Sequence, residues 1–187
     1  MIKYKLYIIS FIIMLSCSLG LYSQNINLSN AIVQNDIKSV ETILKGGANI
    51  NKTDKFGNYP IFVALGNSNI DMIKLLFQYG ADLSLKDKMN NSILIVAAFN
   101  CNQDIVQYLL DQGADVDEKG GTGKNALMFC CIYDGPLNNI EIVKLLVRYG
   151  SDVNLKDSKG RTALDVAIKK EIIEYLTSMG ARKGSEF

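Results

Sequence analysis

The 187-residue chain contains no histidine and no tryptophan, and it has only two prolines. Without histidine, catalysis through a Ser-His-Asp triad or a Cys-His pair is excluded, and so is a metal site built on imidazole ligands. Neither sign of charge dominates, because 20 Lys and Arg residues stand against 19 Asp and Glu residues. The overall balance therefore indicates neither a nucleic-acid partner nor an acidic substrate.

Long apolar runs are absent except at the N-terminus. Lys3 and Lys5 come first, an apolar run covers residues 6–15, and small and polar residues follow up to Gln24. This is the three-part layout of a secretory signal peptide. We therefore predict that residues 1–24 are a signal, cleaved after Gly20 or Ser23, and that the mature protein is exported to the periplasm or secreted.

Two alternatives for this segment stay open. Cys17 follows Met14-Leu15-Ser16, which resembles a loose bacterial lipobox, so that Cys17 would be lipidated and become the mature N-terminus. Alternatively, residues 6–22 would remain as an uncleaved anchor. They fall short of the ~20 apolar residues of a membrane-spanning helix and are interrupted by serine and glycine, so the cleaved signal is favoured.

A period of 33 residues organises the rest of the chain. One marker is a glycine that recurs at intervals of 33, 33, 37 and 30 residues, at Gly47, Gly80, Gly113, Gly150 and Gly180. A second marker is an aliphatic residue that recurs at intervals of 33, 33, 33 and 37, at Leu28, Ile61, Leu94, Leu127 and Leu164. The chain therefore has five repeats, of which the fourth is longer and the fifth shorter.

Each repeat is predicted to form two short helices. In the third repeat, apolar residues recur at spacings of three and four, first at Leu94, Ala97 and Ala98 and then from Ile105 to Leu110. Small residues on the first helix let a neighbouring helix approach closely. The glycine after the second helix suits the left-handed residue that ends many helices.

The residues around these glycines resemble a known family. Residues 80–84, 113–117 and 150–154 read GADLS, GADVD and GSDVN, which resemble the G-A-D-V-N signature of ankyrin repeats. Residues 157–164, DSKGRTAL, look like the D-x-x-G-x-T-P-L that opens such a repeat, and residues 140–146 match its second helix. The chain is thus similar to exported bacterial ankyrin-repeat proteins over about residues 26–183.

The resemblance implies an all-α solenoid of about five helix-turn-helix units joined by β-hairpin-like turns. The ankyrin-repeat domain would cover residues 25–183, with repeats at about 25–53, 54–86, 87–119, 120–156 and 157–183, and residues 184–187 would form a tail. The end repeats have polar residues on their outer sides, as capping repeats need. We expect a monomer.

The chain departs from the family pattern where the first helices begin. Only Pro60 keeps the helix-opening proline, and the threonine before it is replaced by Tyr59, Ser92 and Asn125 until it reappears as Thr162. Ser92, Asn125 and Thr162 are predicted to cap their helices through a side-chain oxygen. Tyr59 lacks that ability, so the helix at Pro60 should rely on the fixed φ of proline.

The resemblance also implies a function, because ankyrin repeats commonly bind proteins on a concave face made of turn tips and first helices. We therefore predict a protein-binding module that is not an enzyme, uses no cofactor and no metal, and binds no nucleic acid. A membrane would be contacted only through a lipid or an uncleaved anchor. The matching contact positions are Lys55, Phe56, Asn58, Asn67, Lys88, Met89, Asn91, Phe99, Asn100, Thr122, Lys124, Ile132, Tyr133, Lys159, Arg161 and Lys169.

Several of these positions hold apolar or aromatic residues where a stack needs no core residue. An aromatic ring supplies contact area, and the lysines and asparagines around it supply orientation. A structural alternative is that Phe56 and Met89 fold back onto their own turns. In the same turns, Asp54, Asp87 and Asp157 are expected to accept hydrogen bonds from nearby backbone N–H groups rather than to act chemically.

Cysteine offers the alternative function, a redox or catalytic protein using Cys101, Cys130 and Cys131. Cys130 and Cys131 stand where the third repeat has two alanines, so they are interpreted as small hydrophobes in a tight helix contact. The glycine-rich residues 120–125 lack the G-x-x-x-x-G-K-[ST] spacing of a phosphate-binding loop. They are interpreted as a turn tip.

The extra residues of the fourth repeat lie between its two helices. Residues 133–137 read YDGPL, and a Gly-Pro pair does not continue a helix, so a longer loop is predicted there. We predict that this loop adds a partner contact with Tyr133 as its anchor. The alternative is a tolerated surface insertion, which loop-closure entropy makes inexpensive.

The export prediction is tested by the mature N-terminus. Protein recovered from the producing organism should begin near Leu21 or Gln24 when it is analysed by N-terminal sequencing and intact mass. A blocked N-terminus at Cys17, with partition into detergent, would instead indicate lipidation. A chain that begins at Met1 would contradict both expectations.

Overall fold

The computed structural model describes residues 28–132 and 139–186. The predictions for residues 1–24, for Cys17 and for the loop from Tyr133 to Leu137 lie outside these residues. Within the described ranges, no helix is both long enough and apolar enough to span a membrane.

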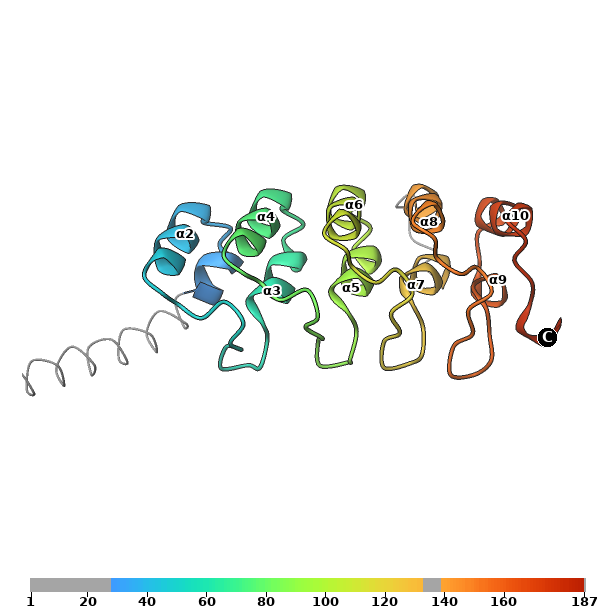
Figure 1. Ribbon diagram of the computed structural model, residues 1–187, viewed down its shortest axis with the longest axis horizontal. Helices are drawn as coiled ribbons and strands as arrows, with labels where there is room; N and C mark the ends of the chain where they lie inside the picture. Colours follow the sequence, from blue (N-terminus) through green and yellow to red (C-terminus); the bar gives the residue numbers. More distant parts are fainter. Residues whose placement is uncertain (1–27, 133–138, 187) are drawn as a thin grey trace, which may run out of the picture. The chain divides into compact units, whose positions relative to one another are not determined.

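The described chain consists of successive helix pairs (Figure 1). The pairs are residues 28–33 with α2 (Ile37–Lys45), α3 (Pro60–Gly66) with α4 (Ile70–Gln78), α5 (Ile93–Phe99) with α6 (Gln103–Asp111), α7 (Ala126–Ile132) with α8 (Asn139–Arg148), and α9 (Ala163–Val166) with α10 (Lys170–Ser178). A short 3₁₀ helix, η1 (Gly184–Glu186), follows. The predicted all-α fold of five helix pairs is confirmed.

The turns between pairs are hairpin-like without forming regular strands. Among the described residues the β-structure is one isolated antiparallel bridge, between Lys86 and Ser92. The helices fall into two compact units. The N-terminal unit contains the described residues up to Asn67 with Asp71–Ala81, and the C-terminal unit contains Ser68–Ile70 with the described residues from Asp82 on.

In the C-terminal unit, helices of the same kind stack on one another. The first helices α5, α7 and α9 pack in sequence, and so do the second helices α6, α8 and α10. Ala97 and Ala98 of α5 and Cys130 and Cys131 of α7 are buried, and side chains of this size allow close helix approach. The two cysteines therefore occupy the small-residue positions, as predicted.

The N-terminal unit has its own apolar core and its own polar ties. The core includes the fully buried side chains of Leu28, Ile32, Ile61, Leu65, Met72, Ile73 and Leu76. The Asn67 side-chain amide donates a hydrogen bond to the carbonyl of Ile32, at the end of the first helix. The Asn51 amide donates to the carbonyl of Gly80 at 2.9 Å. Both bonds join neighbouring repeats within this unit.

The first helices begin largely as predicted. The Ser92 hydroxyl accepts the N–H of Ile95 at 3.3 Å, and the Asn125 side-chain oxygen accepts the N–H of Met128 at 3.0 Å. Tyr59 makes no side-chain cap, and α3 begins with Pro60. These three starts confirm the sequence prediction.

Thr162 forms the predicted cap of α9 as a capping box with Asp165, and its hydroxyl has a further partner. Its hydroxyl donates to the carbonyl of Arg182 at 2.7 Å, and its backbone N–H donates to Oδ2 of Asp165 at 2.8 Å. The same Asp165 oxygen accepts the N–H of Gly184 at 2.6 Å. The start of α9 is therefore held by the capping box of Thr162 and Asp165, and the Thr162 hydroxyl also holds the C-terminal tail.

A polar network joins the third and fourth repeats. Oδ1 of Asp117 accepts hydrogen bonds from the Asn125 amide at 2.9 Å and from the Ser151 hydroxyl at 2.7 Å. Oδ2 of Asp117 accepts the backbone N–H of Asp152 at 2.9 Å. Asn125 is fully buried, so one carboxylate satisfies donors that water does not reach.

The glycine-rich tip of the fourth repeat lies between the tips of its neighbours. A Cβ atom on Gly121 would overlap the carbonyl oxygen of Met89, and one on Gly123 would overlap the Ser158 hydroxyl. Gly123 also has a φ of +74°, which L-residues with side chains rarely adopt. The N–H of Ser158 donates to the carbonyl of Thr122 at 3.5 Å. Glycine therefore lets three successive tips lie side by side.

The Asp117 network generates a stability prediction. Asp117→Ala should lower the free energy of unfolding by about 2 kcal/mol, because it removes the acceptor of the Ser151 hydroxyl and leaves the buried Asn125 amide only its long bond to Ser151, at 3.4 Å. Urea unfolding of the full chain measures the change. The control is Asp115→Ala, which removes an exposed carboxylate that accepts the N–H of Asp117 at 3.0 Å and should cost less than half as much. Equal costs would mean that the network does not join the repeats.

Candidate functional site

The turn tips of the C-terminal unit form a row. The tips are residues 87–91, 120–124 and 157–161, and Figure 1 shows these loops on the side of α5, α7 and α9, away from the second helices. The contact of Gly121 with Met89 and the bond from Ser158 to Thr122 place them side by side. The tips and the first helices together make one face of the unit, which we call the tip face.

Aspartates shape two of the tips from inside, as predicted. Oδ1 of Asp87 accepts the N–H groups of Met89 and Asn91, both at 2.8 Å. Oδ1 of Asp157 accepts those of Lys159 and Arg161, at 2.8 and 3.0 Å. In the N-terminal unit, Asp54 closes its tip in the same way. These carboxylates have a structural role.

Asp157 also forms an ion pair. Its Oδ2 lies 2.7 Å from Nη2 of Arg161, and the carboxylate is almost fully buried. Burial by itself would raise the pKa of Asp157. The Arg161 guanidinium and the backbone N–H groups of Arg161 and Lys159 outweigh burial and hold this pKa below its ordinary value. Arg161, one of the predicted contact residues, is therefore engaged in its own turn.

Large apolar side chains are exposed on the tip face. Met89 is 76% exposed, Phe99 is 54% exposed and Ile132 is 37% exposed. The ring of Phe99 meets that of Phe129 edge to face, with centroids 6.5 Å apart and planes at 88°. Nζ of Lys124 lies 5.8 Å from the Phe129 centroid. Phe99 and Lys124 thus both contact Phe129, and Met89 and Ile132 are exposed on the same helices and tips. We call these five residues the aromatic patch.

Phe129 and Ile168 were not among the predicted contact residues. Phe129 is half-buried and lies 33 residues after Val96, so a bulky aromatic replaces a small aliphatic residue in the repeat pattern. This replacement of Val96 by a phenylalanine one repeat later was visible in the sequence and could have indicated a contact residue. Ile168 is 52% exposed, and its N–H donates to the carbonyl of Cys131 at 3.2 Å. This bond ends α9 early, and no local pattern in the sequence indicated it.

The N-terminal unit has a comparable feature at its own tip. A cleft of about 190 Å³ is lined by Val33, Phe56, Val63 and neighbouring polar residues. Val33 is 63% exposed and Phe56 is 65% exposed, while Nζ of Lys55 lies 4.9 Å from the Phe56 centroid. Phe56 and Met89 are thus exposed and are not folded back onto their turns.

The other predicted contact residues divide into two groups. Asn67 and Asn91 use their side-chain amides in hydrogen bonds to Ile32 and Asp87, and the N–H of Asn58 donates to Asp54. Lys88, Thr122 and Lys159 are exposed at the tips, while Asn100 and Lys169 are half-buried at helix ends. Tyr133 lies outside the described residues. Asn67 and Asn91 thus already have hydrogen-bond partners within the chain, and the contact role of all these residues stays a prediction.

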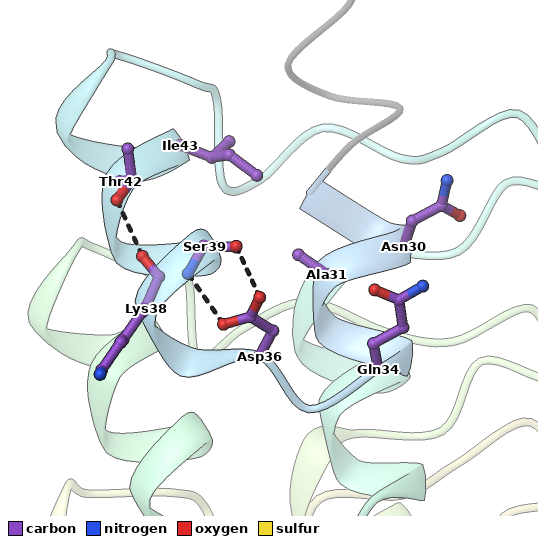
Figure 2. A pocket seen from close by; sticks show the side chains of 8 residues that line it. All are labelled: Asn30, Ala31, Gln34, Asp36, Lys38, Ser39, Thr42 and Ile43. Carbon is purple, nitrogen blue, oxygen red and sulfur yellow. Dashed lines mark hydrogen bonds between the residues drawn. The ribbon is translucent and has the colours of Figure 1, made fainter.

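A second, polar pocket of about 440 Å³ lies on the first repeat (Figure 2). Its lining residues are Asn30, Ala31, Gln34, Asp36, Lys38, Ser39, Thr42 and Ile43. Asp36 accepts the N–H and the hydroxyl of Ser39 at 3.1 and 2.6 Å, so it caps α2. The Thr42 hydroxyl donates to the carbonyl of Lys38 at 2.9 Å. The pocket is built from groups that stabilise the first repeat, which suits an end cap.

The three described cysteines are free thiols of low reactivity. Burial raises the pKa of Cys131 to about 12 and raises that of Cys130 well above its ordinary value. Burial also raises the pKa of Cys101, although Lys169 acts in the opposite direction. A thiol needs to ionise to act as a nucleophile. In the described part of the chain, no cluster of three or more potential acidic or thiol ligands is placed to hold a metal.

Thiol burial predicts an order of modification. With a maleimide reagent near neutral pH, Cys101 should react slowly and first, because it alone of the three is partly exposed. Cys130 and Cys131 should react only after urea unfolding, as peptide mass spectrometry would show. Rapid labelling of either buried thiol in the folded protein would contradict this arrangement and restore the redox alternative.

The geometry agrees with a comparison of the sequence with known families. The profile of ankyrin repeats, in three copies, matches residues 28–120 and again residues 117–186. A comparison with curated proteins gives no match. The two matched ranges together take in all five helix pairs. The chain belongs to the ankyrin-repeat family.

Proposed function

We propose that the chain is a protein-binding module that holds its partner on the tip face. The observation that carries this proposal is the aromatic patch, in which Met89, Phe99 and Ile132 are exposed without contributing to the repeat core. Side chains of this kind at the centre of an interface supply much of its binding free energy. Ankyrin repeats generally bind proteins, so fold and surface support the same class of function.

The composition of the patch also suits recognition. The Phe99 and Phe129 rings meet edge to face, and this contact favours the observed orientation of the exposed Phe99 ring. A pre-positioned ring loses little conformational entropy when a partner covers it. Lys124 and the neighbouring tips add polar groups around this apolar centre, as in the rim of many interfaces.

A catalytic function has little support. The cysteines, which were the candidate reactive groups, have raised pKa values because they are buried. Members of the ankyrin-repeat family are typically binding modules without catalysis. We therefore propose no second function.

We further propose that the module acts outside the cytoplasm, in the periplasm or as a secreted protein. The support is the signal-like pattern of residues 1–24, with lipidation of Cys17 as the alternative attachment. The extra residues of the fourth repeat follow Ile132, a member of the aromatic patch, and this position supports the proposal that the loop contributes to binding.

The proposed function predicts a selective effect of truncating the patch. The double variant Met89→Ala, Phe99→Ala should weaken partner binding about tenfold or more, because central apolar side chains of an interface each contribute upwards of about 1 kcal/mol. Partners would be captured from the exported fraction of the producing organism with the wild-type chain and identified by quantitative mass spectrometry. Binding of the leading partner would then be measured with each variant.

The matched control is Met179→Ala, which removes a 47%-exposed methionine at the end of α10, outside the patch. It should leave binding unchanged. Thermal unfolding of all variants should stay within a few degrees of wild type, since the removed side chains are exposed. A partner retained in full by the double variant would place recognition elsewhere on the molecule.

A further inference from the structure

The near-neutral charge of the whole chain conceals an asymmetry in the C-terminal unit. The tip face carries three lysines, Lys88, Lys124 and Lys159, in addition to the ion-paired Arg161, and Lys169 adjoins it between α9 and α10. Three carboxylates lie on the same tips and first helices, at Asp87, Asp157 and Asp165. In the rest of this unit, acidic residues outnumber basic ones.

The carboxylates of the tip face are engaged with the protein itself. Asp87 accepts two backbone N–H groups through Oδ1 and the Asn91 amide through Oδ2 at 3.2 Å. Both oxygens of Asp157 are used, one by backbone N–H groups and the other by Arg161. Asp165 accepts the N–H groups of Thr162 and Gly184. The oxygens of these carboxylates are therefore occupied by internal donors, and Arg161 matches the charge of Asp157.

The lysines lie around the aromatic patch. Lys88 adjoins Met89, and Lys159 is exposed on the next tip beyond Thr122. Lys124 extends along the Phe129 ring. Lys169, the residue before α10, lowers the thiol pKa of Cys101 against the effect of burial, and Cys101 follows Phe99 by two residues. Positive charge is thus distributed around the apolar centre.

Resting on the proposed function, we propose that the partner segment is acidic, with an aromatic or aliphatic anchor between aspartate or glutamate residues. The anchor covers Phe99 and Met89, and the carboxylates face Lys124, Lys159 and their neighbours. This arrangement is electrostatically complementary to the tip face, and complementarity of this kind selects partners and raises association rates. Because Arg161 matches Asp157, the lysines of this face and the adjacent Lys169 outnumber its remaining carboxylates, Asp87 and Asp165, so the face is basic although the chain is nearly neutral.

A protein segment fits this face better than a nucleic acid. Apolar side chains occupy the centre of the surface, and a phosphate backbone, which is bound through cationic side chains, gains nothing from contact with them. Base stacking needs an open ring face, and Lys124 lies over the ring of Phe129. The lysines therefore act as the rim of a protein interface.

The test uses the full mature chain and a phage library of random peptides as the probe. Selected peptides should be enriched in Asp and Glu next to Phe, Leu or Trp. Their affinity should fall as the salt concentration rises, since rim charges are screened. The charge-reversal variant Lys124→Glu, Lys159→Glu should weaken their binding about tenfold or more at low salt, mainly through slower association.

The matched control is Arg148→Glu, which reverses an exposed cation in the last turn of α8, away from the tip face. It should change peptide affinity by less than about twofold. Circular dichroism and thermal unfolding would establish that each variant is folded, and Lys124→Gln, Lys159→Gln gives an intermediate loss if charge is the cause.

Three results would overturn the acidic-partner proposal, with different consequences. Neutral or basic peptides that lose binding in Met89→Ala, Phe99→Ala would overturn it and leave the proposed protein-binding function intact. Selected peptides insensitive to both double variants would overturn both. Tight binding of a single-stranded oligonucleotide, abolished by the lysine reversals but unaffected by Phe99→Ala, would replace the protein partner with a nucleic acid.

Discussion

Close contact between successive first helices is the constraint on which the rest of the structure depends. One repeat cannot bury its own apolar side, so α5, α7 and α9 have to approach through small residues such as Ala97, Ala98, Cys130 and Cys131. This approach sets the spacing of the tips and brings Phe99 of one repeat against Phe129 of the next. The arrangement of side chains on the tip face therefore follows from the packing of the buried first helices.

Hydrogen bonds between repeats add to this packing. Some of them are made by residues that differ from the family pattern. Asp117 of the third repeat collects donors from the fourth, and Asp165 holds both the start of α9 and the C-terminal tail. These bonds satisfy buried donors that the stack would otherwise leave without partners. The result is that tail residue Gly184, assigned by its position to a separate tail, packs against the fifth repeat.

The sequence predicted what depends on local pattern. The periodic glycines located the repeats, and the short polar residues Ser92 and Asn125 located helix starts, because each effect acts within a few residues. The use of the Thr162 hydroxyl and the early end of α9 were not predictable, since their partners, Arg182 and Cys131, are distant in sequence. The basic character of the tip face was hidden for a related reason. Composition counts Asp87 and Asp157 as surface charge, whereas their oxygens point into their own turns.

The crowding around Gly121 and Gly123 has a consequence for how this surface changes over time. Because a Cβ atom at either position would overlap the neighbouring tips, side-chain variation there is closed, and the central tip can alter its recognition only through Thr122 and Lys124. The flanking tips have no such restriction at Met89 or Lys159, which are exposed. Substitutions that change the side chains of this surface are therefore tolerated mainly on the two outer tips. The middle tip keeps a nearly constant shape and separates them.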